Sequence, residues 1–259
     1  MAVYTKIGLD EINLIEKNFS IGKILNYSGI KKGIENTNYL IKSKKRKFIL
    51  TIFEKRVNSR DLPFFMKLMS GLAKSKIKCP KPVENKKGKY LFKLKGKNAC
   101  LVTFLEGKDK NNLNSKECFV IGKNIARLHN SSKKLRIFRK NSLSVNSWGP
   151  LLKKISRKIN KKFKDLTDNM KTDYIQIKKL WPKKLPTGII HGDLFIDNIF
   201  FYKGRFHGFI DFYFSSNDYY AYDLAICVNA LCFNKKNNKF IMNKNKSSNL
   251  LKGYQSVLS

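Results

Sequence analysis

A short stretch in the second half of the chain carries the residue types that proton transfer and cation binding need. Residues 191–198 read HGDLFIDN, and Asp211 follows further along the chain. A carboxylate such as that of Asp193 can accept a proton from a hydroxyl group. The amide oxygen of Asn198 and the carboxylate of Asp211 are ligands that a hard cation such as Mg²⁺ prefers. The sequence therefore predicts a site that activates a hydroxyl group beside a metal ion.

The elements around this stretch explain how it would be assembled. The apolar pair Ile189-Ile190 leads directly into the stretch, as a buried strand would. Residues 199–202 and 206–210 are largely apolar and flank Lys203-Gly204, which favours a β-hairpin. Such a hairpin would return Asp211 to the side of Asn198.

The spacing His191-x-Asp193-Leu194-x-x-x-Asn198 is typical of a protein-kinase catalytic loop, with glycine in place of arginine. In that loop the aspartate orients the acceptor hydroxyl and takes its proton, and the asparagine binds the metal. His191 is counted among the catalytic residues, although we expect it chiefly to brace the loop through hydrogen bonds. Taken singly, these residues are ordinary turn and capping residues, so the hypothesis rests on their joint spacing.

The rest of the chain predicts an α+β protein with a protein-kinase-like, two-lobed fold. The first half reads as strand, strand, helix, strand, strand, and the second half is mainly helical. We place the boundary between a nucleotide-binding lobe at 1–105 and a catalytic and acceptor-binding lobe at 106–259. The segments concerned are strands at 37–41, 47–53, 90–94 and 99–105, a helix from Asp61 to Leu72, a helix capped by Ser115, and one amphipathic helix at 151–180.

Composition limits the class of protein. The chain has 259 residues, 42% of them hydrophobic, which suffices for a real core. Five scattered cysteines without a paired motif indicate reduced core residues in the cytosol. Acidic residues near the N-terminus and the lack of a long apolar run argue for a cytoplasmic location and against a membrane partner.

The net charge of +36 raises the alternative of a basic scaffold that binds nucleic acid. The lysines are dispersed, however, and short basic runs such as 42–47 lack interleaved aromatic residues for stacking on bases. We therefore expect solvated lysines and no nucleic-acid partner.

With these residues in view, residues 188–198 resemble the Brenner motif of the aminoglycoside phosphotransferase and choline kinase superfamily. Within it, the chain is most similar to the homoserine kinase branch. The stretches that carry this likeness are 1–5, 29–40, 49–51, 54–57, 61–65, 101–107, 209–214, 217–218 and 222–227.

The resemblance implies transfer of the ATP γ-phosphate to the side-chain hydroxyl of L-homoserine, giving O-phosphohomoserine for threonine synthesis. It makes Asp193 the base and assigns Mg²⁺ to Asn198 and Asp211. It also implies that residues 29–38 cover the phosphates, with Gly33, Asn36 and Asn38 as nucleotide contacts, that Phe104 lies in the hinge beside adenine, and that Asp223 braces the catalytic loop.

Three departures accompany the resemblance. Thr51 occupies the position of the phosphate-binding lysine of kinases, and Lys55 is the nearest substitute. The expected helix 61–72 contains no glutamate for the usual Lys–Glu ion pair. Residues 250–255 read as a helix close to the last residue, Ser259, whereas the resemblance implies further helices, so we expect a chain that is short at its C-terminus.

The acceptor site is the least determined feature. Asp197, Asn217 and Asp218 lie in expected loops and are candidates for binding the acceptor, although such residues commonly serve as turn or capping residues. Choline, methylthioribose and aminoglycosides are alternative acceptors for the same fold.

Overall fold

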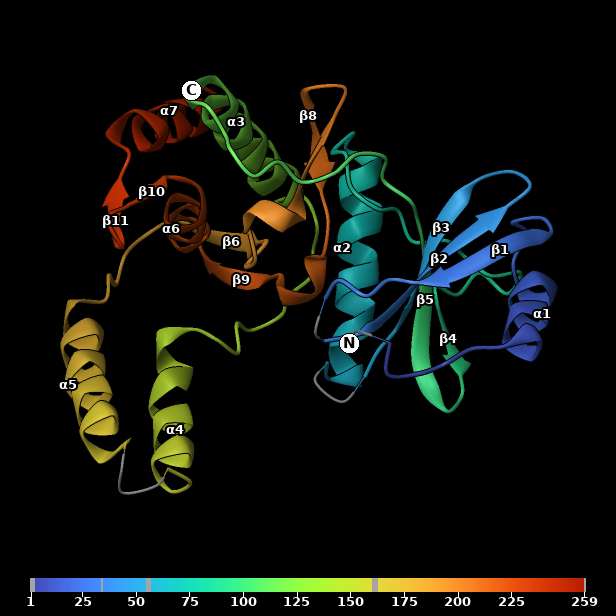
Figure 1. Ribbon diagram of the computed structural model, residues 1–259, viewed down its shortest axis with the longest axis horizontal. Helices are drawn as coiled ribbons and strands as arrows, with labels where there is room; N and C mark the ends of the chain where they lie inside the picture. The colour runs from blue at the N-terminus through green and yellow to red at the C-terminus, as the bar shows by residue number, and fades with distance from the viewer. Residues whose placement is uncertain (1–2, 34, 55–56, 160–162, 259) are drawn as a thin grey trace.

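In the computed structural model, which describes residues 3–33, 35–54, 57–159 and 163–258, a β-rich N-terminal lobe stands beside a mainly helical C-terminal lobe (Figure 1). The N-terminal elements are α1 (Leu9–Asn18), β1 (Ile24–Gly29), β2 (Thr37–Ser43), β3 (Lys47–Ile52), η1 (Ser59–Asp61), α2 (Leu62–Lys74), β4 (Leu91–Leu94) and β5 (Lys97–Thr103). The expected fold class is therefore confirmed, while the lobe boundary at 105/106 stays a prediction.

The five N-terminal strands form one antiparallel sheet in the order β1-β2-β3-β5-β4. Its outer face packs on α1 through Ile12 and Ile15, whereas its inner face packs on α2. Thr51 of β3 lies opposite both Asn38 of β2 and Cys100 of β5. This register places Asn38 and Thr51 on the face of the sheet that is turned toward the other lobe.

Two N-terminal elements are missing from the sequence-based order, namely α1 and β1. The strand β1 lies at the edge of the sheet and is largely exposed, so its residues do not alternate between apolar and polar. Without that alternation an edge strand leaves little signal.

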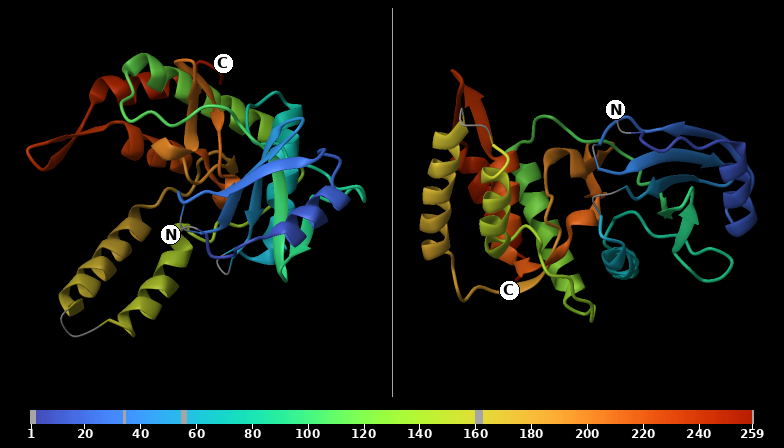
Figure 2. Two further views of the ribbon diagram at one scale, coloured as in Figure 1. Left: turned by 45° about the vertical axis from the view of Figure 1, so that its right-hand side comes forward. Right: turned by 90° about the horizontal axis from the view of Figure 1, so that it is seen from below.

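The second lobe comprises α3 (Ser115–Ser132), α4 (Val145–Ser156), α5 (Lys164–Leu180), β6 (Thr187–Ile190), η3 (Ile196–Asn198), β7 (Ile199–Tyr202), β8 (Arg205–Phe209), η4 (Phe212–Phe214), β9 (Ser216–Tyr219), α6 (Tyr220–Leu231), β10 (Phe233–Lys236), β11 (Lys239–Met242) and α7 (Lys244–Gln255). Helices α3 and α7 lie side by side over the short strands (Figures 1 and 2). None of the helices in the described ranges is long and apolar enough to cross a membrane.

Two details of the helices differ from the expectation. The N-cap of α3 is Asn114, whose side chain accepts a hydrogen bond from the Glu117 amide, and not Ser115. The expected helix 151–180 is two helices, α4 and α5, which project together from the lobe (Figure 2). Like charges four residues apart, such as Lys154 and Lys158, disfavour a continuous helix there.

One continuous core links α2 of the first lobe to the segments around Asp193 and Asp211 in the second. Phe65 and Leu68 of α2 belong to the same buried cluster as Ile121 of α3, Leu194 and Phe212. All five cysteines are buried, as predicted for core residues. The site residues therefore stand on a packed base that both lobes share.

Candidate active site

The segment 191–198 crosses from β6 to β7 in a tight loop. The strand β6 pairs with β9, so that Ile190 lies opposite Ser216. Gly192 follows with φ +78°, and a Cβ atom there would lie 2.9 Å from the carbonyl oxygen of Phe214. Only glycine avoids that contact in this backbone conformation, which explains a glycine where kinases carry arginine.

Asp193 and Asn198 are in direct contact. The Asn198 amide nitrogen donates to the Asp193 carboxylate oxygen Oδ2 at 2.7 Å and to its backbone carbonyl at 2.8 Å. Both partners are acceptors, which fixes the amide orientation and leaves the Asn198 oxygen as the atom for a cation. Loss of hydration on partial burial raises the pKa of Asp193 to about 6, against the lowering effect of the Asn198 hydrogen bond. A carboxylate with this pKa is mostly ionised at pH 7 and still basic enough to accept a proton.

Asp211 returns to Asn198 through the hairpin β7–β8, as predicted. The Ile210 amide donates to the Asn198 carbonyl at 3.0 Å. The Asp211 backbone is left-handed, with φ 61° and ψ 67°, a conformation that costs energy outside glycine and is typical of functional sites. Although its side chain is exposed, crowding by protein atoms and then the charge of Asp193 raise its pKa to about 7.

This donor set fits a magnesium ion. Mg²⁺ is commonly held by one or two carboxylates together with phosphate oxygens and water. Asp211 and Asn198 offer one carboxylate and one amide oxygen, and a bound cation would relieve the repulsion between Asp211 and Asp193. Within the described residues no three His, Cys, Asp or Glu side chains form a metal cluster, so these two ligands would need phosphate oxygens to complete the site.

His191 is fully buried and engaged on both ring nitrogens. Nε2 donates to the Ile210 carbonyl at 2.9 Å, and Nδ1 accepts from the Asp193 amide at 3.3 Å. This pattern defines the neutral ring, and burial lowers the pKa of His191 accordingly. The contacts support the bracing role more than acid–base chemistry.

Asp223 of α6 makes the contacts that bracing of the loop requires. Its carboxylate accepts from the backbone amides of His191 and Gly192, both at 2.9 Å. A third bond comes from Nε2 of His129, also at 2.9 Å. Burial by itself would raise the pKa of Asp223, but these donors outweigh it and the pKa is lowered.

The sequence alone did not indicate that His129 and Tyr254 support Asp223. His129 is buried on α3, and its Nδ1 accepts from the hydroxyl of Tyr254 in α7 at 2.8 Å. The ring of Tyr220 stacks on His129 with 4.4 Å between centroids. One signal was present, because His129 stands four residues after Ile125 and therefore on the buried face of α3.

On the nucleotide side, Thr51 occupies the position of the kinase lysine and is nearly fully buried. Its hydroxyl donates to the Asn38 side chain at 2.8 Å and lies 3.5 Å from the hydroxyl of Tyr213. The Tyr213 ring packs edge-on against Phe53 and Phe65. An aromatic side chain from the segment after Asp211 thus reaches the position where kinases have the lysine.

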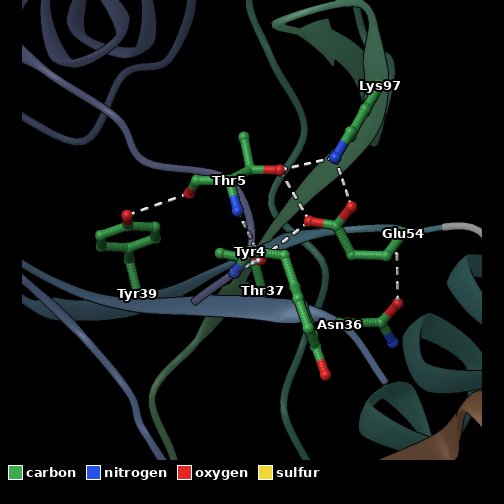
Figure 3. Close-up of polar contacts among 7 residues, drawn as sticks. All are labelled: Tyr4, Thr5, Asn36, Thr37, Tyr39, Glu54 and Lys97. Atoms are coloured by element: carbon green, nitrogen blue, oxygen red, sulfur yellow. Dashed lines mark hydrogen bonds and ion pairs between the residues drawn. The ribbon is translucent and has the colours of Figure 1, made fainter. Parts of the chain in front are cut away.

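Asn36 and Gly33 belong to the loop that is expected to cover the phosphates. Gly33 has φ +106°, and the Asn36 side chain accepts from the Glu54 amide at 3.4 Å. Glu54 lies at the centre of a polar cluster (Figure 3), in which Thr37 and Lys97 also take part. Burial alone would raise the pKa of Glu54, but hydrogen bonds led by that from Lys97 lower it.

That cluster ties the base of the loop to the N-terminal segment. The Thr37 hydroxyl accepts from the amides of Tyr4 and Thr5 at 3.0 and 3.1 Å, and the Thr5 hydroxyl donates to Glu54 at 2.7 Å (Figure 3). Thr37 shares the outer face of the sheet with Tyr39, whereas Asn38 lies on the opposite face with Thr51, toward Tyr213 of the second lobe. The cluster therefore holds the base of the loop from the outer face of the sheet.

Three further residues were predicted to contribute to the site, namely Phe104, Lys55 and Asp197. Phe104 follows β5 and is half-buried, with the Lys47 ammonium 5.3 Å from its ring centre. Lys55 lies outside the described residues. Asp197 lies in η3, next to Asn198.

Asn217 and Asp218 lie in strand β9, which pairs with β6, and not in a loop as expected. The segment that precedes α4 holds both residues. The Asn217 side chain accepts from the Arg139 amide at 2.9 Å, and Asp218 accepts from the Asn141 side chain at 2.7 Å. Their role in binding an acceptor stays a prediction.

A comparison with protein families matches residues 26–241 to the phosphotransferase enzyme family. The chain belongs to this family. Among curated relatives of this phosphotransferase, homoserine kinases of Sinorhizobium medicae and Agrobacterium fabrum are 41% and 42% identical over 257 residues, or 99% of the chain. The matches cover 78% and 79% of those relatives, and the resemblance expected from the motifs is thus confirmed.

Solved structures agree on the fold of this phosphotransferase. An amicoumacin kinase in complex with AMP-PNP and Ca²⁺ has a TM-score of 0.74 at 17% identity, covering 95% of this chain and 78% of that one. A choline kinase from Cryptosporidium parvum has a TM-score of 0.62 at 17% identity, with the same coverage. At this identity the likeness concerns the fold alone.

Proposed function

We propose that the chain transfers the γ-phosphoryl group of ATP to the side-chain hydroxyl of L-homoserine, giving O-phospho-L-homoserine and ADP. The observation that carries this proposal is the 41% identity to a homoserine kinase over 99% of the chain. The contact between Asp193 and Asn198, and the return of Asp211 to their side, supply the groups that such a transfer needs.

In this proposal Asp193 is the base. Its carboxylate orients the acceptor hydroxyl and accepts its proton, the hydroxyl oxygen bonds to the γ-phosphorus, and the bond from that phosphorus to the bridging oxygen breaks. Asn198 holds the carboxylate in place from one side, which leaves the other oxygen for the acceptor. His191 and Asp223 keep the loop in this shape.

Asp211 and Asn198 are the residues proposed to hold Mg²⁺. The ion, when bound, neutralises charge on the phosphates and orients them toward the acceptor. AMP-PNP in the related amicoumacin kinase supports ATP as the donor, and the loop around Gly33, Asn36 and Asn38 is proposed to cover its phosphates.

Direct assay of the purified protein tests the acceptor. With ATP and Mg²⁺ present, we expect phosphate transfer to L-homoserine, and little transfer to choline, methylthioribose or an aminoglycoside at equal concentration. Coupled detection of ADP, with mass spectrometry of the phosphorylated product, separates transfer from hydrolysis. Turnover of choline without turnover of homoserine would overturn the proposed substrate.

The base is tested by Asp193→Asn, which keeps the size of the side chain but cannot accept the proton. We expect kcat to fall by about 10²–10⁴-fold, the usual contribution of a positioned base, with little change in ADP binding. The matched control is Asp173→Asn, which removes an exposed carboxylate of α5. Full activity of the Asp193 variant would show that the base has been assigned wrongly.

A further inference from the structure

Arg139 connects the two lobes close to the candidate metal ligand. It lies between α3 and α4 in the C-terminal lobe, and its guanidinium Nε donates to Asp61 Oδ2 at 2.7 Å. Asp61 is the N-cap residue of α2 in the other lobe. The two side chains are only 14% and 28% exposed, so this ion pair is shielded from solvent more than a typical surface pair.

The same guanidinium also binds the segment that follows Asp211. A second nitrogen donates to the Ser215 carbonyl at 3.0 Å, with the Phe214 carbonyl at 3.5 Å. The Arg139 backbone adds a reciprocal pair with Asn217, because its amide donates to the Asn217 side chain and its carbonyl accepts from the Asn217 amide at 2.7 Å. Arg139 thus holds this segment through both its side chain and its backbone.

Aromatic side chains add to the contacts that Arg139 makes between the two lobes. The guanidinium lies 5.1 Å from the ring centre of Phe65 in α2, and Phe65 in turn packs edge-on against Tyr213. Tyr213 lies two residues after Asp211 and reaches Thr51 of β3. The helix α2, the strand β3 and the segment after Asp211 therefore meet around one guanidinium and two rings.

This arrangement matters because, in the part of the chain that the structure describes, the usual ion pair between the third strand and the neighbouring helix is missing. In kinases a lysine of the third strand pairs with a glutamate of the neighbouring helix, and this pair must be in place for catalysis. Here β3 carries Thr51, and α2 (LPFFMKLMSGLAK) contains no acidic residue. The position of α2 relative to Asp211 must consequently depend on other contacts.

We propose that Arg139 is a positioning residue for phosphoryl transfer, which fixes α2 and the segment after Asp211 in one arrangement through Asp61 and the Ser215 carbonyl. The planar guanidinium has several donors in fixed directions, so it can serve both partners at once in one geometry, which the single nitrogen of a lysine side chain does not fix. Asp211 has a left-handed backbone, which costs energy outside glycine, so contacts that hold the segment after it help to keep its carboxylate in place. The inference rests on the proposed kinase activity but not on homoserine as the acceptor.

The first test is kinetic and uses Arg139→Gln, Arg139→Lys and Asp61→Asn. We expect Arg139→Gln to lower kcat by about 10²-fold, as small misplacements of reacting groups do, and to raise the half-saturating Mg²⁺ concentration. Arg139→Lys should restore only part of the loss. The matched control is Arg136→Gln, which removes an exposed arginine of the same segment.

A double-mutant cycle tests whether the ion pair between Arg139 and Asp61 causes the loss of kcat. If Arg139 acts through Asp61, the double variant that combines Asp61→Asn with Arg139→Gln should lose no more than Arg139→Gln alone. Strictly additive losses would overturn the coupling between the two residues.

The second test is independent of catalysis and of the acceptor. Hydrogen–deuterium exchange of the metal-free protein should rise in peptides covering 212–217 when Asp61, in the other lobe, is replaced by asparagine. It should rise in peptides covering 58–66 when Arg139 is replaced by glutamine. Exchange that changes only in the lobe that carries the substitution would overturn the proposal.

The two tests together separate the proposal from a purely stabilising role. If Arg139→Gln fails to fold, Asp61→Asn carries both measurements, because it changes only one atom of a partly exposed side chain. A lower melting temperature with unchanged kcat, unchanged Mg²⁺ dependence and no exchange change across the lobes would overturn the positioning role. Absence of homoserine turnover in the unaltered protein, by contrast, would leave the exchange result as the test of Arg139.

Discussion

Asp193, Asn198 and Asp211 place two carboxylates and an amide around one small space. The hydrogen bond that the Asn198 side chain donates favours the ionised form of Asp193, whereas loss of hydration opposes it. At Asp211 the same loss of hydration acts together with the negative charge of Asp193. The ionised form of each carboxylate is therefore less stable in the folded chain than in water, and a cation between them would reverse this cost.

The first prediction at this scale is that Asp211→Asn stabilises the metal-free protein while abolishing activity. Asparagine tolerates the left-handed backbone and carries no charge. We expect a gain on the order of 1 kcal/mol in the free energy of unfolding, kept small because the side chain is exposed. Urea titration with and without Mg²⁺ measures it, with Asp173→Asn as the control.

The pH dependence of this gain has a definite sign. A carboxyl whose pKa is raised from 3.8 to about 7 on folding destabilises the folded state when it is ionised. The cost is fully present above about pH 7 and disappears as the pH falls toward 4. The advantage of Asp211→Asn should accordingly be larger at pH 8 than at pH 5, and an advantage that grows as the pH falls would contradict this explanation.

At the scale of elements, the loop between β6 and β7 depends on a residue without a side chain. Gly192 and Gly204 have nearly the same φ, +78° and +75°, but a Cβ atom at Gly204 would meet nothing within 4 Å. Replacing each glycine by alanine therefore distinguishes the cost of the left-handed backbone, which both positions share, from the steric clash, which only Gly192 has.

We expect Gly204→Ala to cost about 1–2 kcal/mol from the left-handed backbone alone and to keep its activity. Gly192→Ala should cost more and lower kcat at least tenfold, because the added methyl group displaces the Phe214 carbonyl or the amide that binds Asp223. Urea titration and steady-state kinetics on both variants measure the difference. Equal losses in the two variants would argue against the clash.

The contact between α3 and α7 is a second feature at the scale of elements. The Tyr254 hydroxyl donates to a buried ring nitrogen of His129, whose other nitrogen donates to Asp223. Packing of the C-terminal helix is in this way connected to the Asp223 carboxylate, which holds the loop between β6 and β7.

Tyr254→Phe should therefore lower the free energy of unfolding by about 1–3 kcal/mol, since it leaves the His129 nitrogen buried without a donor. The control is Tyr222→Phe, which removes a longer hydrogen bond of 3.4 Å to the Leu143 carbonyl at the surface. Chemical denaturation measures both variants. A loss for Tyr222→Phe as large as that for Tyr254→Phe would mean that burial of the acceptor is not the reason.

At the scale of the whole molecule, charge is the dominant feature. The chain carries 54 basic and 18 acidic side chains, for a net charge of +36. Repulsion among so many like charges opposes the compact state, and dissolved salt screens it over a distance of about 10 Å at 0.1 M.

The melting temperature should accordingly rise as NaCl increases from about 0.02 to 0.3 M, a range in which screening lengths shorten toward the spacing of surface charges. The association rate of ATP should fall over the same range, because screening weakens long-range attraction to the anionic nucleotide. Differential scanning calorimetry and stopped-flow binding measure the two effects, with sucrose as an uncharged control. A melting temperature that falls with NaCl would show that ion pairs outweigh the repulsion.

Two elements show which parts of the fold could be predicted from the sequence and which could not. The hairpin β7–β8 was predicted because apolar runs flank a Lys203-Gly204 turn, which is a local pattern. The division of 151–180 into α4 and α5 was not predicted, because an amphipathic repeat continues on both sides of the break. Where the pattern of side chains repeats, the end of a helix depends on packing and charge that the repeat does not reveal.

The sequence by itself determined the family. It also predicted the candidate catalytic stretch and the return of Asp211 to the side of Asn198, because these depend on spacing within a loop and one hairpin. Only the tertiary structure decided what surrounds them. Arg139 meets Asp61 across 78 residues, His129 meets Asp223 across 94, and Tyr213 meets Thr51 across 162. The partners of each contact are far apart in the sequence, so local patterns do not pair them, and they meet only when the chain folds.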